Sequence, residues 1–168
     1  MPNLTTLLQN RLENAKKIAV LAIGSELRGD DYAGIAVAKA LEKKLKKKRT
    51  RPQIKTFIGS TAPENLTGEV KKFKPSHLLI IDAAETGEKS GTVILLKPED
   101  INELAMFSTH KIPINVLVRY FSGSLKCKTI IIGIQPASIK FGKTSSRVVM
   151  KSAEGVAQAI YLASAGIK

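Results

Sequence analysis

Cysteine is almost missing from this 168-residue sequence, in which Cys127 is the single example. One cysteine excludes an internal disulfide framework, and no Cys/His spacing typical of a zinc finger occurs. Long apolar runs are also missing, since the longest uncharged stretches, residues 18–25 and 155–167, are shorter than the roughly 20 residues of a membrane helix. Residues 1–17 lack the apolar segment and cleavage site of a signal peptide. These absences predict a cytoplasmic protein in a reducing compartment, without membrane insertion.

Acidic residues are scarce as well, because 14 Asp and Glu stand against 27 Lys and Arg, leaving a formal charge of +13. Nine basic residues and one acidic residue lie between positions 39 and 55, so this region carries +8 (9 − 1) of the excess. Its densest part, residues 43–51, has no interleaved aromatic residue, and no RNA-binding aromatic motif is present. Nucleic-acid binding is therefore only a minor alternative. The run is interpreted as a solvated turn, as a sign of heat adaptation or as a match for an acidic partner.

What the sequence does contain is an alternation of apolar strands and amphipathic helices in a chain whose length suits one domain, residues 1–168. Strands are expected at residues 18–23, 53–58, 77–81, 92–96 and 129–134. Helices are expected at residues 4–12 and 33–45, from the loop 59–65 to about 73, at 112–120, and over a long C-terminal stretch containing 149–160 that Thr144 or Ser145 caps. This order predicts an α/β fold, a three-layer α/β/α sandwich around a twisted, mostly parallel sheet of about five strands.

In such sheets ligands bind beyond the carboxyl ends of the strands, which directs attention to the loop after the first strand. Gly24 and Gly29 have the spacing of a phosphate-binding loop. Asp30 and Asp31 follow, however, where a phosphate loop has Lys and a hydroxyl residue, and carboxylates repel phosphate. The three-glycine pattern of a dinucleotide fold is absent too. The sequence therefore disfavours a nucleotide cofactor, and no cofactor-binding residues are assigned.

Acids follow two of the expected strands, because Asp31 lies in the first loop and Asp82 ends the third strand. Neighbouring parallel strand ends converge, so the two carboxylates suit a cation or an acid–base task. Simpler roles stay open. Asp31 immediately precedes a helix and is able to cap it, and Asp82 is able to close a turn by bonding to the backbone.

Nitrogen and sulfur ligands are few. His110 lies in a loop without apolar periodicity, and if that loop folds over the sheet it adds one nitrogen to the two carboxylates. His77 begins a strand and is interpreted as structural. Cys127 is interpreted as a small core residue, because no histidine partner lies near it in sequence. No Gly-x-Ser-x-Gly motif or other catalytic triad signature is present.

Five ordered segments resemble the signatures of a known family, the endopeptidases that mature the large subunit of nickel-iron hydrogenases. They are GSELRGDDYAG at residues 24–34, GSTAPEN at 59–65, LIIDA at 79–83, THKIP at 109–113 and GIQP at 133–136. The resemblance covers most of the chain. Two positions depart from the family pattern, which commonly has Asn at Ser25 and Gly at Tyr32. We expect Tyr32 to narrow the cleft or to contact the substrate tail.

The resemblance implies that Asp31, Asp82 and His110 contact nickel that is already installed in the hydrogenase precursor. The enzyme then removes the C-terminal extension of that precursor, and Asp31 and Asp82 are its expected catalytic residues. Two roles of nickel stay open: it is only a recognition key, or it also acts as a Lewis acid or activates water, with Asp31 or Asp82 as general base. Nickel is expected to be carried by the substrate and to bind the isolated protein weakly or not at all, because two carboxylates and one imidazole are an incomplete ligand set. The main alternative is a non-enzymatic, nickel-sensing chaperone or binding partner of the precursor.

Overall fold

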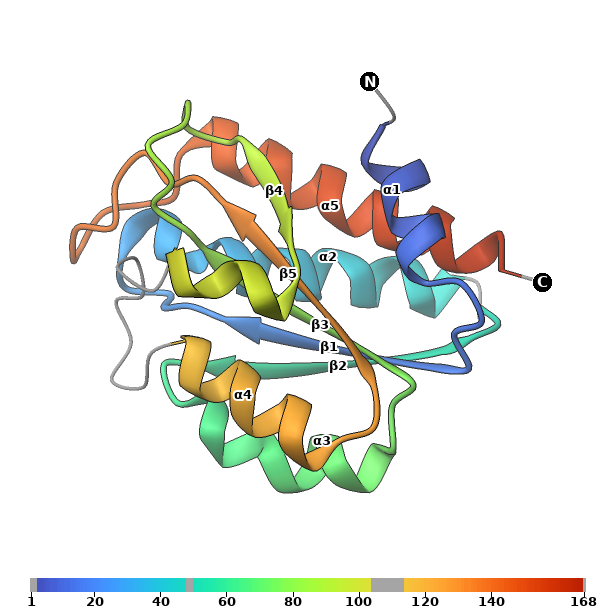
Figure 1. The fold of residues 1–168 in the computed structure, drawn as a ribbon. Coiled ribbons are helices and arrows are strands. Elements are labelled where there is room, and N and C mark those ends of the chain that lie inside the picture. The colour runs from blue at the N-terminus through green and yellow to red at the C-terminus, as the bar shows by residue number, and fades with distance from the viewer. Residues whose placement is uncertain (1–2, 48–49, 104–113, 168) are drawn as a thin grey trace.

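The computed structural model describes residues 3–47, 50–103 and 114–167, and it forms three layers with a sheet in the middle (Figure 1). The strands are β1 (Lys17–Ile23), β2 (Gln53–Ser60), β3 (His77–Ala83), β4 (Val93–Leu96) and β5 (Lys128–Ile134). The helices are α1 (Leu4–Arg11), α2 (Ala33–Lys47), α3 (Thr67–Phe73), α4 (Ile114–Ser124) and α5 (Arg147–Ala165). Three short 3-10 helices, η1 (Gly29–Tyr32), η2 (Pro63–Leu66) and η3 (Pro98–Glu103), lie in the connections.

The sheet has five strands in the order β2-β1-β3-β5-β4. The pairs β1–β2, β1–β3 and β3–β5 are parallel, while β4 runs antiparallel to β5 at one edge. The register places Ala22 of β1 opposite Ile81, and Asp82 opposite Gly133 of β5. The expected mostly parallel sheet is confirmed, and Asp82 lies at the carboxyl end of its central strand.

Apolar side chains leave both faces of the sheet, which explains why the strands read as continuous apolar runs rather than as alternating patterns. Val20 and Leu79 pack into a core under α1, α2 and α5, whereas Leu21 and Leu78 pack into a second core under α3 and α4. Figure 1 shows these two helix layers on opposite faces of the sheet. No helix in the described part of the chain is long and apolar enough to cross a membrane.

Most element boundaries agree with the expectation, and two differ from it, namely the cap of α5 and the end of α4. The N-cap residue of α5 is Ser146, so the expected cap at Thr144 or Ser145 is wrong. The Ser145 hydroxyl instead donates to the carbonyl of Gly29, a contact distant in sequence. Helix α4 continues to Ser124, beyond the expected end at residue 120. The expected start of that helix, at residue 112, lies outside the described residues.

Close contact between α2 and the sheet depends on Gly34 in the first turn of that helix. An ideal Cβ at this position would lie 2.3 Å from the carbonyl oxygen of Ile23 and 2.4 Å from that of Ile81. Real Cβ atoms do not approach backbone oxygens so closely. The glycine therefore lets the start of α2 lie directly on the carboxyl ends of β1 and β3, next to the loop that holds Asp31.

We expect Gly34→Ala to lower the free energy of unfolding by about 1–3 kcal/mol, because the added methyl group overpacks the contact between helix and sheet. Urea unfolding followed by circular dichroism measures the change. Gly155→Ala in α5 is the matched control, since no atom outside its own helix turn lies within 4 Å of its ideal Cβ. That variant should be stabilised by up to about 1 kcal/mol. Equal effects of the two substitutions would contradict the packing role of Gly34.

Candidate active site

The loop after β1 folds back on its own start. Gly24 has φ +144°, and an ideal Cβ there would lie 1.9 Å from the carbonyl oxygen of Asp31, so only glycine fits. The Ser25 N–H donates to that same Asp31 carbonyl at 3.1 Å, and the Gly24 N–H donates to the Ser60 carbonyl at 3.0 Å. The Asp31 carbonyl is therefore held against the start of this loop, and the start of the loop is in turn bonded to the last residue of β2.

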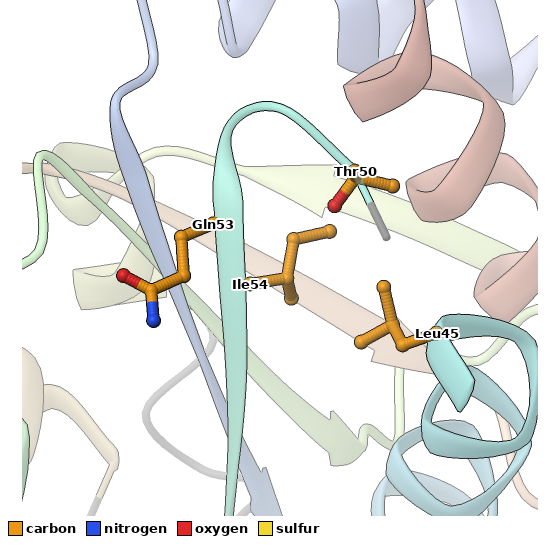
Figure 2. Close-up of a pocket in the computed structure, with 4 residues that line it drawn as sticks. All are labelled: Leu45, Thr50, Gln53 and Ile54. Atoms are coloured by element: carbon orange, nitrogen blue, oxygen red, sulfur yellow. The ribbon is translucent and has the colours of Figure 1, made fainter. Parts of the chain in front are cut away.

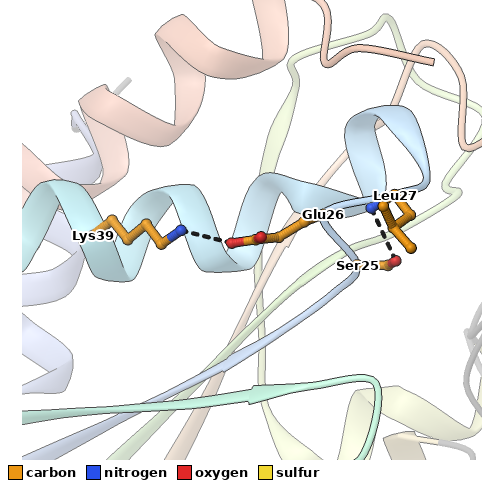
Figure 3. Close-up of polar contacts among 4 residues, drawn as sticks. All are labelled: Ser25, Glu26, Leu27 and Lys39. Carbon is orange, nitrogen blue, oxygen red and sulfur yellow. Dashed lines mark hydrogen bonds and ion pairs between the residues drawn. The ribbon is translucent and has the colours of Figure 1, made fainter. Parts of the chain in front are cut away.

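Exposed polar contacts connect this loop to α2 (Figure 3). The Leu27 N–H donates to the Ser25 hydroxyl at 3.3 Å, and the Lys39 ammonium pairs with the Glu26 carboxylate at 2.6 Å. The same ammonium lies 5.4 Å from the ring centroid of Tyr32. The hydrogen bond to Glu26, and to a smaller extent that to Tyr32, raises the pKa of Lys39 above its usual value. The first turns of α2 are thereby linked to the candidate site.

Asp30 is a structural residue that ties two distant loops together. Its carboxylate is 1% exposed and accepts hydrogen bonds from the Ala137 N–H at 2.8 Å and the Ser138 N–H at 3.1 Å. It also accepts from the Ser146 N–H at 2.6 Å and the Ser146 hydroxyl at 3.0 Å. These bonds attach the loop after β1 to the segment between β5 and α5. The two neighbouring acids of the sequence therefore have different surroundings.

Asp31 and Asp82 lie at the carboxyl edge of the sheet, where the sequence predicts the site. Both are buried, with 2% and 3% of their surface exposed. Asp31 is in η1, and Cα atoms of η1 come within 8 Å of Cα atoms of β3, the strand that carries Asp82. A buried carboxylate is costly unless it is hydrogen-bonded, paired or bound to a metal. The structure thus brings together the elements that carry the two predicted acids.

The simpler roles of the two acids are both compatible with the structure. The Ala83 N–H donates to the Asp82 carboxylate at 2.8 Å, which is the local backbone bond expected of a turn-forming aspartate. Asp31 is the third residue of η1, and α2 begins two residues later at Ala33, so its place before that helix agrees with the cap alternative as well. Asp82 combines a local bond with its place at the end of the strand.

The third predicted ligand, His110, lies outside the described residues. Within the described ranges no group of three or more His, Cys, Asp or Glu side chains is arranged to hold a metal ion. Asp31 and Asp82 are thus two members of the predicted set, and the complete set of three remains a prediction. Cys127 is half-buried against the core under α3 and α4, as expected for a small core residue, and burial raises the pKa of its thiol.

Gln135 joins the loop after β3 to the end of β5, and the sequence indicated its place after the last strand but not these partners. It follows β5 and is 5% exposed. Its side-chain oxygen accepts from the Thr86 N–H at 2.6 Å and the Thr86 hydroxyl at 2.9 Å, and its amide donates to Glu85 at 3.0 Å. The loop after β3 is therefore fixed to the end of β5. The available signal was a polar residue directly after a buried strand.

A cavity of about 510 Å³ lies away from these acids (Figure 2). Its wall includes Leu45, Thr50, Gln53 and Ile54, and Gln53 pairs with Lys17 at the amino end of β1. Figure 2 shows the side chains of Leu45 and Ile54 facing one another. These four residues carry no charge, and they lie at the edge opposite to Asp82. This cavity has no chemical group suited to acid–base or metal chemistry among those residues.

Comparison with known proteins identifies a family. The family model described as hydrogenase maturation protease, HycI, matches residues 35–163. The chain belongs to the hydrogenase maturation protease family. It is 36% identical over 145 residues to a candidate hydrogenase maturation protease of Methanocaldococcus jannaschii, covering 84% of this chain and 85% of the relative. It is 30% identical over 141 residues to the hydrogenase 3 maturation protease of Escherichia coli, covering 83% and 85%.

Solved structures give the same assignment. The crystal structure of the NiFe hydrogenase maturation protease HycI from Thermococcus kodakarensis superimposes with a TM-score of 0.81 and 26% identity, covering 94% of this chain and 97% of that one. The family assignment makes this chain a hydrolase of the endopeptidase type. Both the α/β sandwich and the family suggested by the five sequence segments are confirmed.

We expect Asp30→Asn to lower the free energy of unfolding by about 1–3 kcal/mol, because the amide nitrogen is unable to accept the bonds that now end on that carboxylate oxygen. Chemical denaturation measures the loss. Asp100→Asn is the control, since this aspartate is exposed and accepts a bond from the Lys97 N–H. Its effect should stay within about 0.5 kcal/mol. A neutral Asp30→Asn substitution would show that the carboxylate is not needed to hold the two loops.

His77 predicts a dependence of stability on pH. It is 3% exposed and pairs in register with Lys128. Burial and then the charge of Lys128 lower its pKa. Below about pH 6.5 the imidazole of His77 is protonated in the unfolded chain but stays neutral in the folded protein. The free energy of unfolding should therefore fall as the solution is acidified. His77→Gln should remove that part of the loss between pH 7 and 5 in urea unfolding. Parallel profiles for variant and wild type would contradict the assignment.

Proposed function

We propose that this endopeptidase removes the C-terminal extension from the large-subunit precursor of a nickel-iron hydrogenase after nickel has been inserted. The observation that supports the proposal most is the pair of buried acids, Asp31 and Asp82, at the carboxyl edge of the sheet in a chain of this family. The relative in Escherichia coli is named for the maturation of a hydrogenase, and the one in Thermococcus kodakarensis for NiFe hydrogenase.

Nickel belongs to the substrate in this proposal. Asp31, Asp82 and His110 offer two carboxylates and one imidazole, donors that suit a divalent transition metal but leave its coordination incomplete. Cysteine thiolates of the precursor supply the other ligands. A precursor without nickel lacks the atom that these side chains recognise, so the metal decides which precursor is cut. The isolated protein is expected to bind free nickel weakly.

Peptide hydrolysis needs a base near the bond that breaks. Water attacks the carbonyl carbon of the scissile bond, and the carboxylate of Asp31 or Asp82 accepts the proton that the water loses. The C–N bond then breaks and the proton passes to the leaving amine. Burial of both acids keeps bulk water from competing for them. The loop contacts through Asp30 and Gly24 keep Asp31 in place relative to the start of α5 and the end of β1.

Exposed apolar side chains beside the site suit a protein substrate. Leu27 is 62% exposed and Phe141 is 75% exposed, and the Gly142 N–H donates to the Leu27 carbonyl at 2.8 Å. The two apolar residues therefore lie on adjoining loops, the same loops that Asp30 ties together. Exposed apolar surface of this kind marks protein contacts more often than contacts with small polar ligands.

The decisive test is incubation with hydrogenase large-subunit precursor, nickel-loaded and nickel-free, with the substrate mass read by mass spectrometry. Wild type should release a C-terminal fragment from the nickel-loaded form only. Asp31→Asn and Asp82→Asn should each slow this cleavage at least about 100-fold, which is the lower range for removal of a general base. Asp100→Asn, at an exposed position, is the control and should cleave at the wild-type rate.

Two results would contradict the proposal. Binding of the nickel-loaded precursor without cleavage by wild type would favour a nickel-sensing chaperone. Cleavage that is equally fast with the nickel-free precursor would show that the metal is not what the site recognises. The comparisons identify proteases, which favours the endopeptidase over the chaperone and over the nucleic-acid alternative before the experiment is made.

A further inference from the structure

A groove of about 320 Å³ lies between α2 and α5, the helices that pack side by side over one face of the sheet (Figure 1). Small side chains form its floor, where Ala36 is 6% exposed and Ala153 is 1% exposed. Exposed lysines stand along its α2 side, namely Lys39, Lys43 and Lys46. The alanine side chains at the floor and the exposed lysine side chains at the rim form a groove that is open to solvent.

The positive charge of the groove is only partly compensated. Glu154 on the α5 side pairs with Lys44 at 2.7 Å, and Glu42 accepts a hydrogen bond from the Thr56 hydroxyl. Lys39 pairs with Glu26. Lys43 and Lys46 form no ion pair with any residue of the described ranges. They begin the run of residues 43–51, which holds seven basic residues and no acidic one.

The other end of the groove adjoins the candidate site. Tyr32 lines the groove and directly follows Asp31 in the chain. From Tyr32 to Lys46 the helix rises about 20 Å, at roughly 1.5 Å per residue. An extended peptide advances about 3.3 Å per residue, so the groove accommodates about six residues. A chain segment in the groove thus reaches from the basic end of α2 to the residue beside Asp31.

We infer that this groove docks an acidic segment of the protein substrate, an inference that rests on the proposed function. Carboxylates of the segment pair with Lys43 and Lys46, whose charges have no partner among the described residues. A polypeptide fits better than a nucleic acid, because Glu42 and Glu154 interrupt the positive charge of the groove. A peptide is able to place uncharged residues beside these glutamates, whereas a nucleic acid carries a phosphate at every nucleotide. Two lysines of the basic run, Lys43 and Lys46, thereby become substrate contacts.

The test compares Lys43→Glu/Lys46→Glu with Lys72→Glu/Lys126→Glu, a control that makes the same charge change on exposed residues outside the groove. Binding of nickel-loaded precursor is measured by calorimetry, and its cleavage by mass spectrometry. The groove variant should raise Kd and KM about tenfold, while the control stays near wild type. Its kcat should remain within about twofold of wild type, because rim charges act on encounter rather than on the chemical step.

Three further measurements separate loss of docking from misfolding of a variant and from cleavage of the precursor. Lys43→Gln/Lys46→Gln places no acid at the end of α2, and it should raise Kd in the same direction by a smaller factor. A Glu-rich peptide should bind wild type and compete with the precursor, and added salt should weaken both effects. Thermal unfolding of each variant should match that of wild type.

Equal Kd values for the groove variant and its control would overturn the docking inference and leave the proposed function intact. Tighter binding of a single-stranded oligonucleotide than of the Glu-rich peptide, lost in the groove variant, would overturn it in favour of nucleic acid. A third outcome is a precursor that binds more weakly to the groove variant but that wild type never cuts. It would support the docking inference and contradict the proposed cleavage of that precursor.

Discussion

The buried carboxylate of Asp30 is the interaction on which the arrangement of the site depends. It accepts bonds from backbone and hydroxyl donors at residues 137, 138 and 146, more than 100 residues away in the chain. Such charge-assisted bonds are roughly twice as strong as neutral ones. Because the acid has no freedom to move, the next residue, Asp31, is held at the sheet edge. The loop that carries Asp31 and the rim that carries Phe141 are consequently parts of one rigid arrangement.

Glycines make that arrangement possible where side chains would prevent it. Gly24 lets the Asp31 carbonyl approach the end of β1, and Gly34 lets α2 lie directly on the ends of β1 and β3. Both contacts act on the backbone on either side of Asp31. Backbone packing at these two glycines therefore acts together with the side-chain bonds of Asp30 in positioning the site. Neither position tolerates substitution, because any Cβ there collides with a carbonyl oxygen.

The sequence was sufficient for most of the fold, because strands buried on both faces leave long apolar runs such as that of β3. It was also sufficient to place Asp31 and Asp82 at one edge, since parallel strands end together. The structural role of Asp30 could not be predicted, because its partners come from a segment that only the fold brings near. The cap of α5 was misplaced for the same reason, as Ser145 is engaged by Gly29 instead. Local patterns carry no information about such distant partners.

The placement of charge argues that recognition and chemistry are separated within the site. Acids are buried at the sheet edge, where the proposed function has a substrate-held cation or an attacking water meet them, while lysines are exposed along α2, where the proposed docking segment would bind. An ammonium close to Asp31 would compete with a divalent metal for its carboxylate. The nearest groove lysine, Lys39, is instead engaged by Glu26, at 2.6 Å, and lies over the ring of Tyr32. Tyr32 follows Asp31 in the chain and its ring lies under the Lys39 ammonium, so the proposed docking groove and the proposed reaction site meet at this residue.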